Sequence, residues 1–410
     1  MSNPAELADY EWLVGDEAAV VLRDLAGRDE PLHTLAGRLR KQFSTERSHL
    51  LLEQVELRER ARAKFARAEE MFFTRIGLEQ ATDEWVAWYK ARRFAEVAAA
   101  RAVTDLCCGI GGDLLALGEV AQVVGVDRDD VSGTLAAANA RALGRDQNVK
   151  VEAADVDAYE LGQHVAWHLD PDRRPQGRRT TALAWSSPGT ETIERLLSAS
   201  PHAAVKLAPA ADLPAAWEER CELEWISRDR ECRQLVAWHG SLARDVGKRC
   251  ATVLSVDGKE SASFAGEANV EFSYAPLDQF LFEPDPAVLA AQLAGAFGDR
   301  HGLSALSPGI AYLTGPQAID SPLLACFAVN EVLPLDLRKI SDALCVRHIG
   351  RLEIKKRGVD HDPQRVRKQL RVGGDNEATL LLTKLNGKHA AILAQRCEIP
   401  APIAALNTQP

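Results

Sequence analysis

The sequence lacks the features that mark secreted, membrane-spanning or metal-stabilised proteins. It has no apolar run near the roughly 20 residues that a helix needs to cross a bilayer, and no signal-peptide pattern at its N-terminus. Its eight cysteines include no C-x-x-C pair, so the sequence indicates neither a disulfide framework nor a zinc site. We therefore expect a cytoplasmic protein that uses no metal and contacts no membrane. Its 410 residues predict two or three domains.

The most informative segment is the glycine-rich run Asp105-Leu-Cys-Cys-Gly109-Ile-Gly111-Gly112-Asp113. It continues a strand-like stretch that begins at Ala102 and leads into a helical pattern, after which a second strand ends at Asp127. Glycines allow the backbone to pass close to a ligand, and a carboxylate at the tip of the next strand can hold both hydroxyls of a ribose. These elements together predict a nucleotide-binding unit.

Two kinds of nucleotide site have to be compared. A dinucleotide fingerprint requires G-x-G-x-x-G, and here Leu114 stands at the position of the third glycine. The turn instead has Asp105 four residues before its first glycine. This arrangement resembles motif I of class I S-adenosylmethionine-dependent methyltransferases. The resemblance implies S-adenosyl-L-methionine as the cofactor, with Asp105 at its methionine end.

The order of the following segments indicates a doubly wound α/β sheet. A helical stretch from Val131 to Leu143 precedes a strand at 150–155, and further strands are expected at 164–169 and 203–207. Two more strand-like segments are separated by Arg-Asp-Arg and predict a closing hairpin, at 222–227 and 232–238. Because ligands bind at the carboxyl ends of parallel strands, we expect the site at that edge of the sheet.

The resemblance to class I methyltransferases extends to further cofactor residues. Asp155 matches a carboxylate that often meets the adenine amino group, and Val156 would lie beside the adenine ring. Cys107 and Cys108 are more simply explained as small packing residues than as nucleophiles. The candidate cofactor-binding residues are Asp105, Cys107, Gly109, Gly111, Asp113, Asp127, Arg128, Asp155 and Val156.

The segment Asp170-Pro171-Asp172-Arg173-Arg174 is the candidate catalytic site. Methyl transfer is an in-line displacement, so the main task of the enzyme is to place the acceptor opposite the sulfur. At this position amino-methyltransferases often carry D/N-P-P-Y/F/W, where the side-chain oxygen and the following carbonyl accept hydrogen bonds from the target nitrogen. Asp170 and Pro171 match that pattern, whereas Asp172 and Arg173 replace the second proline and the aromatic. Arg173 and Arg174 are candidate substrate contacts, and a solvated Asp-Pro turn is the alternative.

Several other segments carry a more particular resemblance. They are 169–174, 177–179, 185–188 and 205–209, then 78–83 with Tyr89-x-x-x-Arg93-Phe94, and in the C-terminal part 312–314, 331–334 and 351–360. Together they resemble a bacterial methyltransferase family that carries a C-terminal THUMP-like domain, over roughly residues 70–398. The core is also similar to trimethylguanosine synthase. The resemblance implies the fold, the cofactor and RNA as the substrate class, and it places Gln80, Thr82 and Asp83 in the lid of the cleft.

The predicted organisation has three parts. Residues 1–95 form a helical region, 96–275 the methyltransferase domain and 276–410 a THUMP-like α+β domain. In the last part, apolar spacing predicts one helix between Pro284 and Leu303. Further helices are expected at 337–344 and 363–370, with strands at 351–356, 378–384 and 388–394. The dipeptide Asn386-Gly387 predicts a tight hairpin between the last two strands.

The main charge asymmetry lies in this last domain. Between Asp336 and Arg371 there are eleven Lys and Arg against five Asp and Glu, whereas the whole chain has a net charge of −10. Such a concentration of positive charge suits a phosphate backbone, although a solvated surface or an acidic protein partner would also explain it. In a strand, alternate residues share a face, so Arg351, Lys355 and Arg357 would lie on one face, while Leu352 and Ile354, with Lys356, would lie on the other and the apolar residues would pack inward. The candidate RNA contacts here are Arg351, Lys355, Lys356 and Arg357.

Three functions remain compatible with the sequence. The first is a methyltransferase that modifies RNA, with the basic domain positioning the substrate. The second is a methyltransferase that acts on a protein or a small molecule. The third is an RNA-interaction protein that binds the cofactor without catalysis, because the aromatic after Asp170-Pro171 is missing. The fold does not choose among them, and the acceptor atom, a general base and the oligomeric state stay open.

Overall fold

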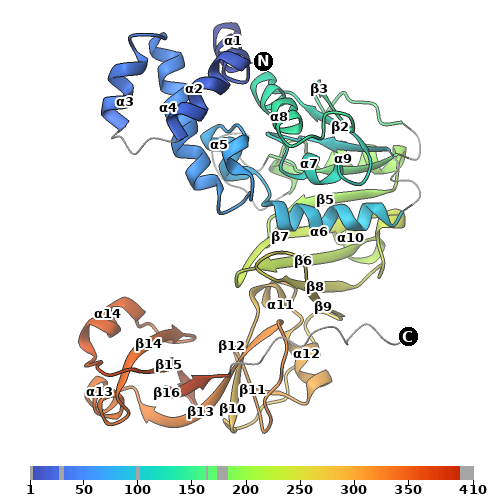
Figure 1. Ribbon diagram of the computed structural model, residues 1–410. Helices are drawn as coiled ribbons and strands as arrows, with labels where there is room; N and C mark the ends of the chain where they lie inside the picture. Colours follow the sequence, from blue (N-terminus) through green and yellow to red (C-terminus); the bar gives the residue numbers. More distant parts are fainter. Residues whose placement is uncertain (1–2, 27–31, 98–101, 163–164, 173–182, 398–410) are drawn as a thin grey trace. The chain divides into compact units, whose positions relative to one another are not determined.

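The computed structural model describes residues 3–26, 32–97, 102–162, 165–172 and 183–397. The chain divides into two compact units. The first unit comprises Met1–Leu223, Gln234–Gly247 and Leu254–Glu260, and the second comprises Glu224–Arg233, Lys248–Val253 and Ser261–Pro410. Figure 1 shows the course of the chain through the elements of each unit.

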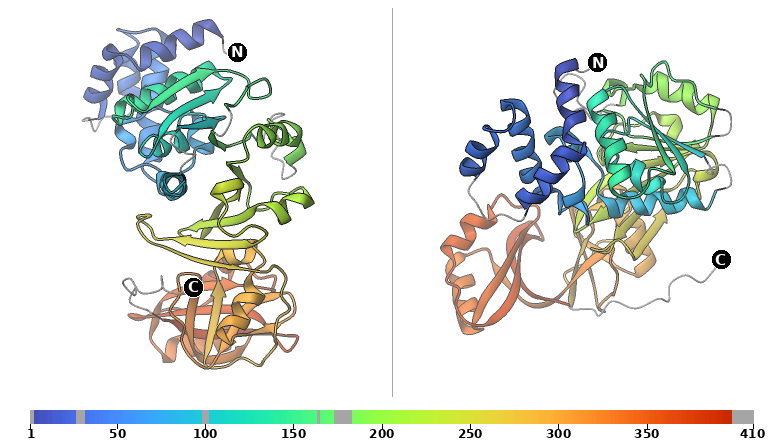
Figure 2. Two further views of the ribbon diagram at one scale, coloured as in Figure 1. Left: turned by 90° about the vertical axis from the view of Figure 1, so that its right-hand side faces the viewer. Right: turned by 45° about the horizontal axis from the view of Figure 1, so that its top comes forward.

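The N-terminal part of the first unit is helical, as the sequence predicts. Helices α1, α2 and α3 contact α4, and α1 also lies beside α8 of the sheet region (Figure 2). Side chains cap several of these helices: that of Ser44 accepts a hydrogen bond from the backbone of Arg47 at 3.2 Å. The helices are α1 (Pro4–Leu13), α2 (Asp16–Ala26), α3 (Leu32–Leu39), α4 (Thr45–Ala61), η1 (Ala68–Glu70), α5 (Arg75–Gln80) and α6 (Glu84–Ala95).

The sheet that follows has the strand order β3-β2-β1-β4-β5-β7-β6-β8-β9. Strands β1 to β5 are parallel, and β7 is antiparallel to β5. The chain proceeds from β1 to β2 and β3 on one side and then returns to β4 on the other, so the switch point lies at β1. The strands are β1 (Ala102–Leu106), β2 (Gln122–Asp127), β3 (Val149–Ala153), β4 (Ala166–Leu169), β5 (Ala203–Leu207), β6 (Glu222–Arg228), β7 (Glu231–Trp238), β8 (Arg249–Leu254) and β9 (Ser261–Gly266).

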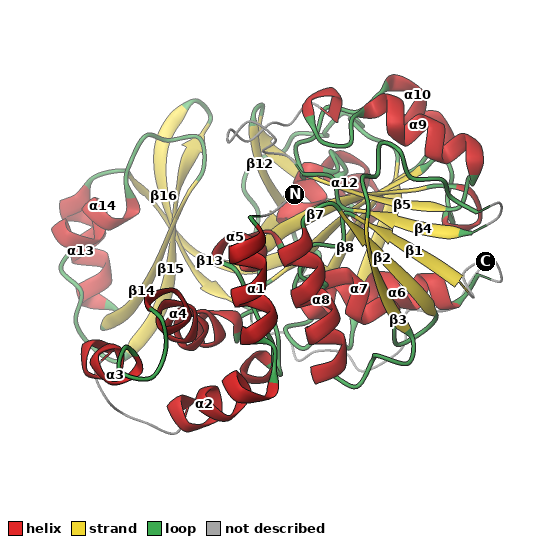
Figure 3. Cartoon of the chain, turned by 90° about the horizontal axis from the view of Figure 1, so that it is seen from above, coloured by secondary structure: helices red, strands yellow, loops and turns green. Residues whose placement is uncertain are grey.

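Helices cover both faces of the parallel strands, which confirms the predicted doubly wound fold. Figure 3 shows α7 and α8 on one face and α9 and α10 on the other. Burial on both faces explains why β4 and β5 are buried along their whole length. The helices here are α7 (Gly112–Leu117), α8 (Asp130–Ala142), α9 (Thr190–Ala199) and α10 (Ala215–Arg220), with the short helices η3 (Leu183–Trp185) and η4 (Gly240–Leu242).

Two predicted strand boundaries in this sheet are corrected. Strand β3 ends at Ala153, so Asp155 lies in the loop beyond the strand, and β4 begins only at Ala166. The predicted hairpin of β6 and β7 is confirmed, with Asp229 and Arg230 at its turn in the left-handed region, at φ 54° and 59°. None of the helices in the described ranges is long and apolar enough to span a membrane.

The second unit contains a seven-stranded sheet of order β11-β12-β10-β13-β16-β15-β14. Helices α13 and α14 pack on one face of β14 to β16 through a buried apolar cluster that includes Ile340, Leu352 and Leu380 (Figure 3). The strands are β10 (Phe280–Pro284), β11 (Ser304–Ser307), β12 (Ile310–Gly315), β13 (Leu324–Pro334), β14 (Ile349–Lys356), β15 (Asn376–Leu385) and β16 (Lys388–Arg396). The helices are α11 (Pro286–Ala290), α12 (Ala294–His301), α13 (Leu337–Val346) and α14 (Pro363–Gln369).

The single helix predicted between Pro284 and Leu303 is wrong, because two helices occupy this stretch. The break falls at Gln292, whose φ of 60° is left-handed and cannot continue a helix. The backbone of Gln292 is held by a hydrogen bond from Asn269 at 3.0 Å. Apolar residues keep their helical spacing on both sides of Gln292, so the periodicity of the sequence did not predict the break between the two helices. The predicted turn at Asn386-Gly387 is confirmed, with both residues at positive φ.

Candidate functional site

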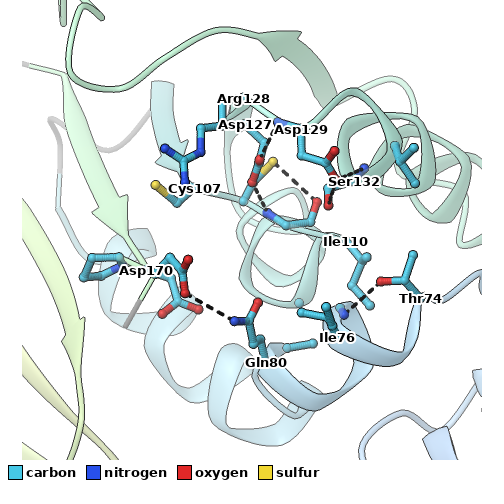
Figure 4. A pocket seen from close by; sticks show the side chains of 18 of the residues that line it. Thr74, Ile76, Gln80, Cys107, Ile110, Asp127, Arg128, Asp129, Ser132 and Asp170 are labelled. Atoms are coloured by element: carbon cyan, nitrogen blue, oxygen red, sulfur yellow. Dashed lines mark hydrogen bonds between the residues drawn. The ribbon is translucent and has the colours of Figure 1, made fainter. Parts of the chain in front are cut away.

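A cavity of about 680 Å³ lies at the carboxyl edge of the parallel strands in the first unit. Its wall comes from the turn after β1, the ends of β2 and β4, the loop after β3, and helix α5. In Figure 4, Asp127 and Arg128 lie across the cavity from Asp170 and Gln80. The predicted site residues that line it are Asp105, Cys107, Gly109, Asp113, Asp127, Arg128, Asp155, Val156, Asp170 and Pro171.

The glycine turn gives each glycine a different task. Gly109 faces the cavity, and a Cβ built on it would meet no atom within 4 Å, so the space beside its backbone is open. Gly111 caps α7 at φ 97°, a conformation that other residues rarely adopt, and it does not line the cavity. A Cβ on Gly112 would lie 3.0 Å from the backbone of Thr82. The last two glycines therefore shape the turn, and the first leaves room for a ligand.

Asp127 is held rigidly at the end of β2. Its Oδ2 accepts a hydrogen bond from the backbone N–H of Gly109 at 2.8 Å, and its Oδ1 accepts one from Asp129 at 3.0 Å (Figure 4). Burial raises the pKa of the Asp127 carboxyl, against the lowering effect of these two bonds. Each carboxylate oxygen can still accept another hydrogen bond, so ligand hydroxyls remain suitable partners.

The loop after β3 forms another part of the wall. The Oδ1 of Asp155 accepts a hydrogen bond from the backbone of Asp157 at 3.0 Å, which fixes the start of the loop. The carbonyl of Val156 accepts one from Arg195 of α9 at 3.1 Å, and the Val156 side chain is buried. The loop therefore presents a carboxylate beside an apolar side chain.

Asp105 belongs to a chain of buried polar groups. Its Oδ1 lies 2.7 Å from Nδ1 of His168, and Nε2 of that ring lies 3.0 Å from Nζ of Lys90. Lys90 also lies 2.7 Å from Oδ1 of Asp113, whose Oδ2 accepts a hydrogen bond from Thr82 at 2.7 Å. The Oδ2 of Asp105 has no hydrogen-bond partner among the residues that the structure describes. Sequence reasoning did not single out Lys90, although a lysine inside the apolar face of a helix is a signal.

Burial and pairing move the pKa values in this chain in different directions. Burial raises the pKa of the Asp105 carboxyl, against the opposing effect of His168. Burial also lowers the pKa of Lys90, although the neighbouring Asp113 carboxylate acts to raise it. Burial alone would raise the pKa of the Asp113 carboxyl, but the Lys90 ammonium holds this pKa well below its usual range. The short Lys90–Asp113 contact thus offsets part of the burial cost of that pair, whereas Asp105 has a partner on only one of its two oxygens within the described residues.

The candidate acceptor residue Asp170 is ion-paired. It follows β4, and its Oδ2 lies 2.5 Å from Nζ of Lys206 in β5. The same ammonium lies 3.4 Å from the carbonyl of Gln80. Lys206 lies in the segment 205–209 that carries the family resemblance, but no role was predicted for it. A lysine inside the otherwise apolar strand 203–207 was the signal that could have found it.

The residues after Asp170 pair with a neighbouring loop. Asp172 and Ser187 exchange two backbone hydrogen bonds, of 2.8 and 2.9 Å. The Oδ1 of Asp172 lies 3.4 Å from Nε2 of Gln80. Arg173 and Arg174 lie outside the described residues. Of the three residues expected in the lid, Gln80 and Thr82 line the cavity, whereas the side chain of Asp83 caps α6.

The two cysteines of the turn have the properties of packing residues. Cys107 lines the cavity at φ 57°, directly after β1, and the buried Cys108 also lines it. Burial raises the pKa of both thiols well above the ordinary value, with nearby carboxylates acting in the same direction. A thiolate nucleophile is thus disfavoured at both positions.

The basic residues of β14, and Arg357 directly after it, are partly neutralised within the second unit. Leu352 and Ile354 pack into the apolar cluster, as their alternation predicts. On the opposite face, Nζ of Lys355 lies 2.7 Å from Oε2 of Glu283, and Nη2 of Arg357 lies 3.6 Å from Oε1 of that residue. Arg351 lies 3.4 Å from Glu377 but remains largely exposed, as does Lys356. Fewer basic side chains of this segment are therefore exposed and unneutralised than the sequence alone suggests.

The fold is thus a doubly wound α/β sheet with a cavity at its switch point, where such sheets bind their ligands. Residues 324–396 match the family described as THUMP domain-like. Two proteins of Mycobacterium tuberculosis, from strains CDC 1551 / Oshkosh and H37Rv, are described as uncharacterized S-adenosylmethionine-dependent methyltransferases. Each is 32% identical to this chain over 363 residues, which cover 86% of this chain and 97% of the relative.

A solved structure of a methyltransferase candidate from Porphyromonas gingivalis W83 shares the fold. It has a TM-score of 0.72 at 19% identity, and the match covers 97% of this chain and 100% of that chain. The chain belongs to the S-adenosylmethionine-dependent methyltransferases and carries a C-terminal THUMP-like domain. It is thus an enzyme that uses S-adenosylmethionine, which confirms the family, fold and cofactor predicted from the sequence.

Proposed function

We propose that this methyltransferase modifies RNA. The observation that carries the proposal is the charge of the THUMP-like domain: residues 336–371 have eleven basic against five acidic side chains, a net charge of +6, in a chain of net −10. Positive charge gathered against the overall sign attracts a phosphate backbone and orients it before chemistry begins. The THUMP-like domain would thus hold the substrate, and the cavity of the first unit would carry out the transfer.

The cavity residues fit the cofactor. A volume of about 680 Å³ lies within the range of small-molecule sites. The Oδ2 of Asp105, which lacks a hydrogen-bond partner in the described ranges, can accept a hydrogen bond from an ammonium group, which the methionine end of the cofactor carries. Asp127 would accept hydrogen bonds from the ribose hydroxyls, Asp155 from the adenine amino group, and Val156 would contact the ring. Gly109 leaves its backbone accessible, with Cys107 and Arg128 beside it, whereas Gly111 and Asp113 maintain the turn.

Asp170 would orient the acceptor. When bound, the cofactor supplies a methyl group on a sulfonium sulfur, which a nucleophile displaces in line. Lys206 holds Oδ2 of Asp170, so Oδ1 and the carbonyl of Pro171 are left to accept hydrogen bonds from an acceptor N–H. A neutral nitrogen acceptor needs this orientation more than it needs a general base. The ion pair with Lys206 fixes the direction in which the carboxylate points.

The RNA contacts would be electrostatic. Arg351 and Lys356 are the exposed basic residues of β14, whereas Lys355 and Arg357 share their charge with Glu283. Phosphate contacts by such side chains release counterions and therefore weaken steeply with salt. Arg173 and Arg174 remain further candidates next to the acceptor site.

A labelling experiment tests the substrate class. Purified protein is incubated with tritium-labelled S-adenosylmethionine and a cell extract, and the product is divided between ribonuclease and proteinase digestion. We expect the tritium label to be released by ribonuclease digestion and not by proteinase digestion. Lys356→Glu should reduce the labelling, whereas the control Lys259→Glu, an exposed lysine of the first unit, should not. Label that only proteinase releases would overturn the RNA proposal.

A second candidate function, methylation of a protein amine or a small cation, rests on the charge of the cavity. Its lining contains eleven carboxylates and two arginines. Such a wall favours neutral or cationic acceptors over phosphate-rich ones. The acidic lining consists of Glu6, Glu53, Glu79, Asp105, Asp113, Asp127, Asp129, Asp155, Asp157, Asp170 and Asp172. The proteinase arm of the labelling experiment detects this activity directly.

A further inference from the structure

Four ionisable side chains from four different elements meet beneath the cavity. Lys90 comes from α6, Asp105 from β1, Asp113 from α7 and His168 from β4. Each is at most 6% exposed. Ionisable groups are seldom buried to this extent, because each must recover the cost of losing water. Such an arrangement inside a cofactor site therefore calls for a role.

The hydrogen bonds of this group run in one direction. The ammonium of Lys90 can only donate, and a carboxylate can only accept. Nδ1 of His168 must therefore donate to Asp105, and its Nε2 is left to accept from Lys90 at 3.0 Å. This pattern requires the neutral ring with its proton on Nδ1, a tautomer that follows from the partners. Lys90 at the same time donates to Asp113 at 2.7 Å.

The partners within the group are unequal. Asp113 contacts the Lys90 ammonium at 2.7 Å, whereas among the described residues Asp105 receives only the hydrogen bond from His168. Its Oδ1 is bound to His168, while Oδ2 has no partner within the described part of the chain. Asp105 lines the cavity, so a cationic ligand group is the partner that this oxygen lacks.

We infer that Lys90 and His168 are positioning residues for the cofactor: they hold Asp105 so that its second oxygen receives the ammonium group of the amino-acid end. The inference rests on the proposed role of Asp105 in cofactor binding. Lys90 fixes the tautomer of His168, and His168 fixes the orientation of the carboxylate. The nucleoside end of the ligand meets other residues, Asp127 and Asp155, and is independent of this relay.

Because the nucleoside end is bound by other residues, a positioning role of Lys90 and His168 can be distinguished from a purely structural one. A relay that only supported the fold would, when broken, weaken every ligand of the cavity to a similar extent. A relay that positions Asp105 would weaken only ligands that carry the amino-acid end. S-adenosylhomocysteine has that end, and 5′-methylthioadenosine has the same nucleoside without it. Their dissociation constants, measured by calorimetry on the full chain, report the difference.

The main variants act at His168. His168→Leu removes both hydrogen bonds, and we expect S-adenosylhomocysteine to bind at least about tenfold more weakly, as for the loss of a hydrogen bond to a charged group. Binding of 5′-methylthioadenosine should change less than about twofold, because its contacts are retained. His168→Asn can place an amide N–H near the position of Nδ1, so it should restore most of the lost affinity. Equal weakening of both ligands, or none, would overturn the inference.

A second variant keeps the test decisive if His168→Leu does not fold. Lys90→Met combined with Asp113→Asn removes an ion pair without leaving a single buried charge. It should also weaken S-adenosylhomocysteine selectively, because His168 loses the donor that fixes its tautomer. An unchanged ratio of the two affinities in this variant would contradict the relay. Wild-type protein that binds neither ligand would instead refute the proposed cofactor site itself.

Discussion

At the scale of single residues, three carboxylates of the candidate site differ in their partners. Asp127 is held by backbone N–H groups, Asp170 by Lys206, and Asp105 by His168. Asp127 ends β2, Asp170 directly follows β4, and Asp105 is the last residue but one of β1, so all three lie at the same edge of the sheet. Chemically identical side chains thus keep different parts of their acceptor capacity free for a ligand.

Replacing Asp127 tests the ribose contact. Asp127→Ala removes a carboxylate that can accept hydrogen bonds from two hydroxyls, and we expect S-adenosylmethionine to bind about 10- to 100-fold more weakly. Isothermal calorimetry measures the change. The exposed Asp146→Ala is the control and should bind as the wild type does. Unchanged affinity in Asp127→Ala would remove this residue from the cofactor site.

Replacing Asp170 tests the orientation of the acceptor. Asp170→Asn keeps the size of the side chain but exchanges one acceptor oxygen for a donor. We expect the turnover to fall about 100-fold, corresponding to about 2.7 kcal/mol in the barrier, while the cofactor affinity is retained. Asp157→Asn is the matched control and should leave the turnover unchanged. Asp157 lines the same cavity, but its Oδ1 accepts a hydrogen bond from the Thr192 hydroxyl at 2.6 Å, and no role in orienting the acceptor is proposed for it. Full activity of Asp170→Asn would show that another group orients the acceptor.

His239 should make the stability of the first unit depend on pH. Burial lowers the pKa of this residue from 6.5 to about 4. Between these values the unfolded chain binds a proton that the folded chain does not, so stability rises with pH and is lost on acidification. The loss should approach about 3 kcal/mol between pH 6.5 and 4.

Thermal melting as a function of pH measures this effect. His239→Phe keeps an aromatic ring against Trp217, whose ring centre lies 4.9 Å away, and it should flatten the profile over that range. His49→Gln, at an exposed position of α4, serves as the control and should leave the slope unchanged. A profile equally steep in His239→Phe would assign the acid sensitivity to other groups.

At the scale of elements, the sequence predicted most of the parallel sheet and little of what closes the site. Strand β5 was predicted to the residue, and the turn after β1 was identified from its glycines and carboxylates. Local patterns suffice there because alternation, turn residues and strand order are written in neighbouring positions. The Lys206–Asp170 pair joins residues 36 positions apart, and the Lys90–His168 contact joins residues 78 apart. No local pattern reports such pairings.

The region of the break between α11 and α12 likewise depends on a contact with a segment that is distant in the sequence. Gly295 lies so close to the second unit's 270 loop that a Cβ on it would stand 1.9 Å from the carbonyl oxygen of Val270. Gly295→Ala should therefore destabilise the second unit by about 2 kcal/mol or more, as overpacking does in a well-filled interior. Chemical denaturation measures the loss. Gly373→Ala is the control, because its Cβ would meet nothing within 4 Å.

At the scale of the whole molecule, charge is distributed unevenly along the chain. The net charge is −10, while residues 336–371 carry a net +6, eleven basic side chains minus five acidic ones. If these residues bind RNA, the logarithm of the affinity should fall linearly with that of the salt concentration. Lys356→Glu should reduce the slope, and fluorescence titration at several salt concentrations measures it. Affinity independent of salt would argue against electrostatic RNA binding.

The acidic wall of the cavity has a consequence for turnover. If the cofactor binds in this cavity, eleven acidic side chains line the space around a ligand that has a positively charged sulfonium before transfer and a neutral thioether afterwards. The reaction would then discharge the ligand inside a negative field, which attracts the incoming cofactor more strongly than the spent one. The enzyme should expel its own by-product readily and resist inhibition by it, without a moving part to drive the exchange.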